Sequence, residues 1–522
     1  MSTQPDGAAP VTGRTWLAIG AAILGVFMAV LDTQITNASL PEILGSLSAS
    51  LEEGSWMSTT YLAAEVVAIP LTGFFLRMFG ARTFILINTW LFLILSTLCG
   101  LAWNLESMIV FRALQGFFGG ALIPTAMTLI IVSLPPARRP MALAWLMLAS
   151  TLAPTLGPTL GGILTELYSW PSIFYINWIP GVLMLAGIAI GLDPQKKHLE
   201  LLEKLDWLGI AGMIVGLGAL IVFLEEGNRK DWFDSDFIRI MALVAFGGIL
   251  MWLGSQLLRP EPFVNVWLFG RRNFWVSSGV GAAAGVGLYG STFVLPLFLA
   301  QVADYNSRQI GEVIMWMGLP QIIMTPLAAV LAKKIDNRII CTAGLLLFAG
   351  SCFMNAFMTA ETGYDQLIAA QVLRALGQPL VIIALSNMAI HAIEPANLSS
   401  ASSLYNMTRV LGGAIGTAVL STAITMREHL HFDRIGETVT LYSEATRERI
   451  ATLTAASLQQ SGDPALAAQQ ALASLQAVVR REAYVMAYSD SFFIIGSVLL
   501  AAIGLVWLAD RIVAPNGKSP GR

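Results

Sequence analysis

A series of long apolar segments constrains this sequence more than any other feature. A helix needs about 20 mostly apolar residues to cross the hydrocarbon core of a bilayer. Hydrophobic residues make up 56% of the 522-residue chain and charged residues only 12%, whereas soluble domains carry about 25% charged residues. The sequence therefore predicts an all-α membrane protein with fourteen transmembrane helices. We place them at 15–39, 55–76, 83–102, 107–132, 141–166, 172–192, 207–224, 237–257, 274–300, 309–331, 338–359, 365–390, 398–425 and 488–510.

The connections between these segments leave little room for other chemistry. Only the connection 426–487 is long, and no stretch suits a soluble enzymatic domain, so we expect no enzyme. The sequence has no phosphate-binding loop, no metal-ligand spacing among its cysteines and histidines, and no basic patch for nucleic acid. We therefore expect neither a cofactor nor a metal.

The distribution of lysine and arginine predicts the orientation of the chain. Cytoplasmic segments of membrane proteins carry an excess of these residues. With the N-terminus inside, the cytoplasmic segments hold 17 of them, whereas the short outer loops hold only Arg229, Lys230 and Arg308. We expect both termini in the cytoplasm and the connection 426–487 in the periplasm.

Two pairs of similar segments indicate an internal repeat. PLTGFFLRMFGAR from Pro70 matches PLAAVLAKKIDNR from Pro326, and VFRALQG from Val110 matches VLRALGQ from Val372. Each pair is eight predicted helices apart, which indicates two six-helix halves with two extra helices between them. A parallel six-helix repeat is the layout of major facilitator transporters, whose binding site lies between the halves. The predicted units are 1–192, 193–273 and 274–522.

Glycine and proline alternate along the fifth apolar segment, in APTLGPTLGG. Glycines at helical spacing let a neighbouring helix approach closely, and each proline removes a backbone hydrogen bond and bends the helix. The pattern suits either a tight packing seam or a bend that biases a gate, and it resembles the antiporter motif of proton-coupled drug exporters. The residues concerned are Pro154, Gly157, Pro158, Gly161 and Gly162.

Further motifs extend this resemblance over nearly the whole chain. LDTQITNASLP at 31–41 resembles the first-helix motif of the fourteen-span drug:proton antiporter family of the major facilitator superfamily, and FRALQGFFGG at 111–120 resembles its fourth-helix motif. SSLYNMTRVLGGAIGTA at 402–418 is similar to the thirteenth span of the EmrB-type branch of multidrug efflux subunits. GFFLRMFGAR resembles the family's loop motif, through Gly73, Arg77, Gly80 and Arg82. Arg77 stands where the general motif has an acidic residue, so the usual carboxylate gate contact is absent.

Five ionisable residues fall inside the apolar segments, where they cost several kcal/mol and usually face a cavity or a partner. They are Asp32, Glu65, Arg112, Arg374 and Arg409. Glu65 is near the middle of its segment, so we expect it to carry the proton; a static helix–helix hydrogen bond is the alternative. Asp32 is further out and either joins Glu65 in proton coupling or serves an outer gate. Arg112 cannot release a proton and acts as a charged partner. Arg374 is either another charged partner or only the counterpart of Arg112 in the second half of the repeat.

Aromatic, methionine and asparagine side chains supply candidates for a substrate cavity. Such side chains form adaptable apolar surfaces, although packing or lipid contact is the commoner use. The candidates are Tyr61, Trp145, Met147, Tyr289, Phe293, Asn387, Tyr405 and Asn406.

The connection 426–487 contains a helix signal, Asp463 and Pro464, followed by residues that favour helix. It predicts a helix or hairpin in the periplasm, which either caps the last two spans or docks an adaptor. The resemblance implies a periplasmic adaptor protein and a TolC-type outer-membrane channel as partners.

Together these features predict a proton-coupled antiporter in the bacterial inner membrane. It would export hydrophobic or amphipathic toxic compounds, which links it to antibiotic resistance, and would use the proton motive force. Two alternatives stay open. One is a dedicated exporter of an endogenous metabolite, siderophore or fatty acid, and the other is a non-transporting receptor on the same fold.

Overall fold

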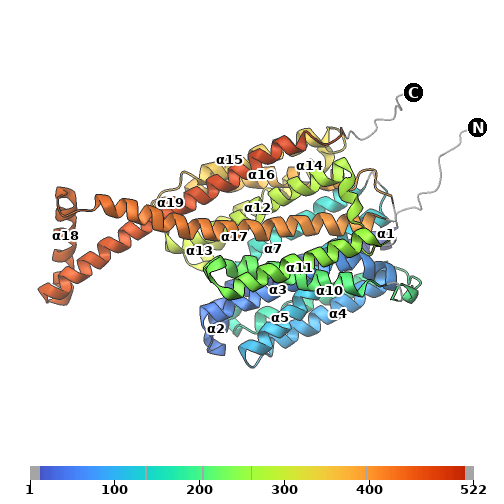
Figure 1. Cartoon of the computed structure of the whole chain (residues 1–522), viewed down its shortest axis with the longest axis horizontal. Coiled ribbons are helices and arrows are strands. Elements are labelled where there is room, and N and C mark those ends of the chain that lie inside the picture. Colours follow the sequence, from blue (N-terminus) through green and yellow to red (C-terminus); the bar gives the residue numbers. More distant parts are fainter. Residues whose placement is uncertain (1–11, 136–137, 203–204, 260–261, 395–396, 512–522) are drawn as a thin grey trace, which may run out of the picture.

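The computed structural model describes residues 12–135, 138–202, 205–259, 262–394 and 397–511 (Figure 1). Every regular element of these residues is helical. The helices are α1 (Gly13–Ala38), α2 (Leu40–Leu47), α3 (Leu51–Phe79), α4 (Ala81–Gly100), α5 (Leu105–Gly120), α6 (Leu122–Ser133), α7 (Arg139–Tyr168), α8 (Ser172–Tyr175), α9 (Trp178–Gly191), α10 (Trp207–Gly227), α11 (Asp236–Leu258), α12 (Arg272–Gln301), α13 (Ser307–Gly318), α14 (Gln321–Leu331), α15 (Asn337–Asn355), α16 (Tyr364–Ala389), α17 (Leu398–Thr438), α18 (Glu444–Ser461) and α19 (Pro464–Val506).

Thirteen spans of the described chain are long and apolar enough to cross a membrane, and the bent helix α7 makes fourteen. The prediction of an all-α protein with fourteen spans is confirmed. Several spans begin at the signals that the sequence supplies. Ser50 and Glu53 form a capping box at the start of α3, and Asp463 accepts from the Ala465 amide ahead of Pro464 at the start of α19.

The first six spans, α1 to α9, form an N-terminal half, and the last six, α12 to α19, form a C-terminal half. Equivalent helices pack in the same way in both. The first span packs on the fifth and sixth, as α1 on α7 and α9, and its counterpart α12 packs on α17 and α19. Likewise α4 packs on α5 and α9, as α15 does on α16 and α19. The two halves thus share this pattern of helix contacts.

The two extra helices, α10 and α11, pack tightly on each other through glycines and attach to both halves. Glu226, at the end of α10, is fully buried and accepts hydrogen bonds from Ser55 (3.1 Å) and Thr59 (3.0 Å) of α3. Two residues on, Asn228 donates to Ser421 of α17 at 3.0 Å. The end of the inserted pair thus connects the N-terminal half to the C-terminal half.

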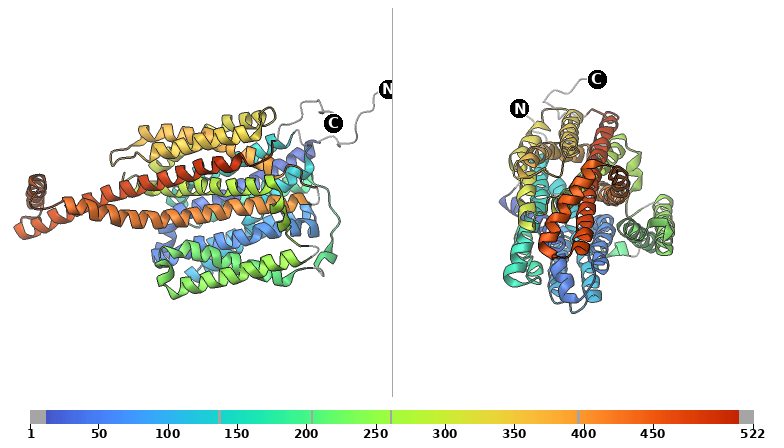
Figure 2. Two further views of the ribbon diagram at one scale, coloured as in Figure 1. Left: turned by 45° about the horizontal axis from the view of Figure 1, so that its top comes forward. Right: turned by 90° about the vertical axis from the view of Figure 1, so that its left-hand side faces the viewer.

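The segment 426–487 is mostly a continuation of two spans. Helix α17 runs unbroken for 41 residues and α19 for 43, so both extend beyond the bundle as a hairpin with α18 lying across its tip (Figures 1 and 2). The ion pair Arg480–Glu428 (3.1 Å) and the hydrogen bond between His431 Nε2 and Asp490 Oδ2 (2.8 Å) join the two helices at the base. The hairpin projects away from the bundle, so the alternative of a cap over the last two spans is wrong.

Candidate functional site

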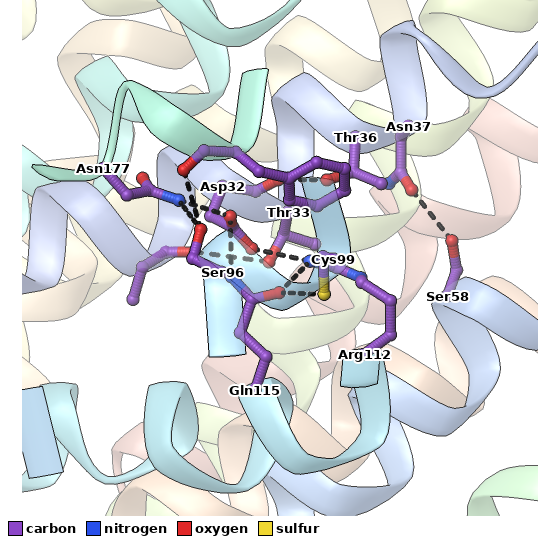
Figure 3. Close-up of polar contacts among 12 residues, drawn as sticks. Asp32, Thr33, Thr36, Asn37, Ser58, Ser96, Cys99, Arg112, Gln115 and Asn177 are labelled. Carbon is purple, nitrogen blue, oxygen red and sulfur yellow. Dashed lines mark hydrogen bonds and ion pairs between the residues drawn. The ribbon is translucent and has the colours of Figure 1, made fainter. Parts of the chain in front are cut away.

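A buried ion pair lies at the centre of the N-terminal half. Asp32 of α1 and Arg112 of α5 meet with 2.7 Å between Oδ2 and Nη1, and each side chain is only 1% exposed (Figure 3). Both residues stand on long apolar helices, which carry them to a depth where water cannot compensate the charges. The sequence did not identify which carboxylate pairs with Arg112.

Neutral polar side chains hold the second carboxylate oxygen in place. Asp32 Oδ1 accepts from Gln115 Nε2 at 2.9 Å and from Asn177 Nδ2 at 2.6 Å. The Gln115 Oε1 atom accepts from Arg112 Nη1 at 2.9 Å, which closes a ring of hydrogen bonds, and Asn177 Nδ2 also contacts Ser96 Oγ at 2.9 Å (Figure 3). Buried ion pairs require such additional hydrogen bonds, so the network holds Asp32 and Arg112 in one geometry.

Arg112 also stacks on an aromatic ring. Its guanidinium carbon lies 4.1 Å from the ring centre of Tyr61, a cation–π contact. The contact requires α3 and α5 to lie very close: a Cβ added to Gly116 would lie 2.3 Å from the Tyr61 carbonyl oxygen. Two of its guanidinium nitrogens, Nε and Nη2, are buried and have no hydrogen-bond partner among the residues that the structure describes.

Glu65 lies one helical turn beyond Tyr61 on α3 and is half-buried. Both Arg112 and Arg409 are near enough to interact electrostatically with its carboxylate. No hydrogen bond or ion pair within 4.0 Å joins Glu65 to another described residue, in contrast to Asp32. Close packing against Gly120 of α5 positions its backbone.

A cavity of about 100 Å³ lies between the two halves beside these charges. It shares Gln34, Tyr289 and Thr292 with a larger cavity of about 440 Å³, whose wall includes Asn37 near the end of α1 and Leu297 near the end of α12. These helix ends lie on the hairpin side of the bundle (Figure 1). The smaller cavity is lined by Val30, Gln34, Ile123, Met147, Ser150, Thr151, Pro154, Leu288, Tyr289, Thr292, Met317, Arg374, Gln378, Ile382 and Arg409.

Of the candidate cavity residues, Met147, Tyr289 and Phe293 line one or both of these cavities. The other five candidates line neither. Tyr61 supports Arg112, and Trp145 is 46% exposed on the surface of α7. Tyr405 is buried, Asn406 Oδ1 accepts from Arg409 Nη2 at 2.6 Å, and Asn387 is half-buried on α16. Aromatic and amide content did not distinguish cavity walls from packing.

The glycine–proline segment of α7 packs against α1. A Cβ added to Gly157 would lie 2.5 Å from the Gln34 Cβ, whereas Gly162 has open space. The helix bends by 50° between Arg139–Pro154 and Thr159–Tyr168. Pro154 lines the cavity and Gly161 is buried, and the Pro158 side chain lies outside the described part of the chain.

The loop motif joins the two halves at the face opposite the hairpin. A Cβ on Gly73 would lie 2.8 Å from Ser399 Oγ of α17, so a larger residue there would displace that hydroxyl. Gly80 has φ of +75°, which favours glycine. Arg77 Nη2 donates to the Phe263 carbonyl at 3.2 Å and Arg82 Nη2 to the Ala189 carbonyl at 3.1 Å. Arg77 thus bonds a backbone carbonyl in place of the missing carboxylate contact.

Sequence reasoning missed the neutral members of the network. Gln115, Asn177 and Ser96 each interrupt an apolar segment, and Gln115 follows Arg112 at the i+3 spacing that places two side chains on one helix face. That spacing was the available signal. The described residues contain no cluster of three potential metal ligands.

Comparison with known proteins identifies relatives of the whole chain. The family model described as Major Facilitator Superfamily matches residues 22–417. The colistin resistance protein EmrB of Acinetobacter baumannii is 33% identical over 95% of this chain and 96% of its own. The fatty acid resistance protein FarB of Neisseria gonorrhoeae is 34% identical over 93% and 94%, and the multidrug export protein EmrB of Escherichia coli K12 is 30% identical over 95% and 96%.

The solved structure of the human organic anion transporter MFSD10 superposes with a TM-score of 0.61 at 13% sequence identity. The match covers 95% of this chain and 100% of that one. At this identity the likeness concerns the fold, and it agrees with the two-half arrangement described above.

Proposed function

Because the chain belongs to the Major Facilitator Superfamily and has EmrB-type relatives, we propose that it is a proton-coupled antiporter. It exports hydrophobic or amphipathic toxic compounds across the bacterial inner membrane, with both termini in the cytoplasm. The names of the relatives, which concern colistin resistance, fatty acid resistance and multidrug export, support an export role.

The electrostatic interaction of Glu65 with two arginines, one from each half, is the observation that carries this proposal. Arg112 belongs to the same half as Glu65, whereas Arg409, on α17, belongs to the other half. A nearby positive charge favours the ionised form of a carboxylate, and its withdrawal in a water-poor site favours protonation. Rocking of one half against the other changes the separation of Glu65 from Arg409. Glu65 therefore binds a proton in one arrangement of the halves and releases it in the other.

Asp32 has a different part in this proposal. Asp32 and Arg112 lie in the same half, and three further hydrogen-bonding side chains surround them. A rigid-body movement of the halves leaves their distance unchanged. Asp32 therefore positions Arg112, which in turn sets the charge environment of Glu65 and supports Tyr61.

The projecting hairpin of α17, α18 and α19 supports a tripartite system. It stands on the side toward which the larger cavity extends (Figure 1), which we assign to the periplasm. Exported molecules would leave the cavity near its base. We propose that the hairpin docks a periplasmic adaptor protein, which connects the pump to a TolC-type outer-membrane channel.

Reconstitution tests the proposal directly. Proteoliposomes loaded with a fluorescent lipophilic dye are given a pH gradient, and dye movement and proton flux are followed together. We expect gradient-dependent dye movement in the native protein and its loss in Glu65→Gln, which keeps the shape but cannot ionise. Glu312→Gln, at an exposed position, is the matched control. Dye movement that ignores the gradient would exclude antiport, and coupled movement in Glu65→Gln would remove Glu65 from the mechanism.

A further inference from the structure

The charges in the wall of the smaller cavity have one sign. Two arginines, Arg374 and Arg409, are among the fifteen described residues that line it, and none of these fifteen is acidic. Arg409 has a carboxylate, Glu65, within electrostatic reach. The remaining positive charge, that of Arg374, faces the cavity without such compensation.

Arg374 is a buried cation without an ion-pair partner among the described residues. It is 3% exposed and comes from α16. Within the described part of the chain, Arg374 donates through Nη2 to Thr292 Oγ1 at 2.9 Å and to the Leu288 carbonyl at 3.2 Å. Its Nε is buried and has no hydrogen-bond partner among the described residues.

The comparison with Arg112 shows what Arg374 lacks. Both arginines are buried and both lie near an aromatic ring, Tyr61 at 4.1 Å for Arg112 and Phe348 at 5.5 Å for Arg374. Arg112 has Asp32 as a counterion at 2.7 Å. A buried charge is normally paired or neutralised, so the position of Arg374 calls for an anion that the protein does not itself supply.

The rest of the cavity wall suits the apolar part of an amphipathic anion. Apolar side chains of both halves line the cavity, including Ile123, Leu288, Met317 and Ile382. Gln378, one helical turn after Arg374, adds a neutral amide on the same face of α16. An elongated apolar body with one anionic head group satisfies both parts of this surface.

We propose that the preferred substrates are amphipathic carboxylates, whose head group pairs with Arg374 while the apolar body occupies the cavity between the halves. The proposal rests on the proposed export function and names its substrate class. Guanidinium–carboxylate pairing is geometrically specific and stronger than neutral hydrogen bonding, so Arg374 selects against lipophilic cations.

Two probes with the same twelve-carbon chain and opposite head groups test it: laurate and dodecyltrimethylammonium. Their equilibrium binding to the full-length protein in nanodiscs is measured against empty nanodiscs. We expect laurate to bind more tightly than the cation. Arg374→Gln should weaken laurate binding about 10- to 100-fold and leave binding of the cation unchanged or tighter. Arg374→Lys should give an intermediate value, and Arg308→Gln, at an exposed position, should have no effect.

Two results would overturn the proposal. One is equal or tighter binding of the cation to the native protein, which needs no variant. The other is an equal loss of both probes in Arg374→Gln, which indicates a purely structural role. Transport in proteoliposomes distinguishes failure of the proposed substrate class from failure of antiport. Coupled export of the cation without export of laurate rejects the substrate class and keeps antiport, whereas gradient-independent movement of both probes rejects antiport.

Discussion

Substitution of Asp32 by asparagine tests whether the buried network has the energetics that its geometry implies. The variant keeps the side-chain shape, and its carbonyl oxygen can still accept from Gln115 and Asn177. Its amide group would then face Arg112 Nη1, 2.7 Å from the present Oδ2 atom, so two donors oppose each other. Because both partners are 1% exposed, the arginine is left as an uncompensated buried charge. Breaking a buried pair in this way costs about 3–5 kcal/mol.

The free energy of unfolding in mixed micelles, followed by tryptophan fluorescence, measures this effect. A double-mutant cycle uses Asp32→Asn, Arg112→Gln and the double variant. Each single variant should lose about 3–5 kcal/mol, and the double variant should lose about 1–3 kcal/mol less than the sum. Asp236→Asn removes an exposed pair with Arg239, whose side chains are 88% and 54% exposed, and should change stability by less than about 1 kcal/mol.

Additive losses would refute the reasoning, because they would mean that Asp32 and Arg112 do not interact energetically. So would a loss in Asp32→Asn no larger than that of the Asp236→Asn control. In that case the 2.7 Å contact would not stabilise the fold, and the assignment of Asp32 as the residue that positions Arg112 would fail.

Three further predictions concern close packing and the hairpin. Gly157→Ala should reduce dye export because its Cβ would overlap α1, whereas Gly162→Ala should not, since nothing lies within 4 Å; equal export by both variants would contradict this. Gly120→Ala should impair export more than Gly218→Ala, because a Cβ at Gly120 would lie 2.5 Å from the Glu65 carbonyl oxygen of α3. Export by the two variants is compared at matched expression. Replacing 439–463 by a short linker should preserve transport in proteoliposomes but abolish resistance of intact cells; lost transport in both would assign the tip a role in the pump itself.

The sequence predicts the number and order of the spans well, because each span is a local property of about 20 residues. It fails at the ends of α17 and α19. Hydropathy marks where a helix leaves lipid, and the residues beyond that point are polar, although the backbone stays helical to Thr438 and from Pro464. The hydropathy pattern alone therefore predicts a loop where the structure has the hairpin. Its helical content follows from propensity and the Asp-Pro signal.

Prediction from the sequence has a different limit at the candidate site. The intramembrane charges are visible in the sequence, but their pairing is not. Asp32 and Glu65 are both plausible partners for Arg112, and the choice depends on how α1, α3 and α5 pack. Glycines decide it: Gly116 and Gly120 bring α5 onto the backbone of α3, so that Arg112 passes over Tyr61 and reaches Asp32 on α1. Such long-range packing has no periodic signal in the sequence.

The two carboxylates differ in the way a two-half transporter requires. A group that senses the conformation must interact with a charge in the other half, because only distances between halves change when they rock. In the proposed mechanism Glu65 meets this condition through Arg409, which interacts electrostatically with its carboxylate, and no hydrogen bond joins Glu65 to another described residue. Asp32 meets the opposite condition, since Arg112, Gln115 and Asn177 all belong to its own half. A protein that used Asp32 as its proton site would have to break the 2.7 Å contact with Arg112 in each cycle, whereas in the proposed mechanism Glu65 needs only the approach and withdrawal of Arg409.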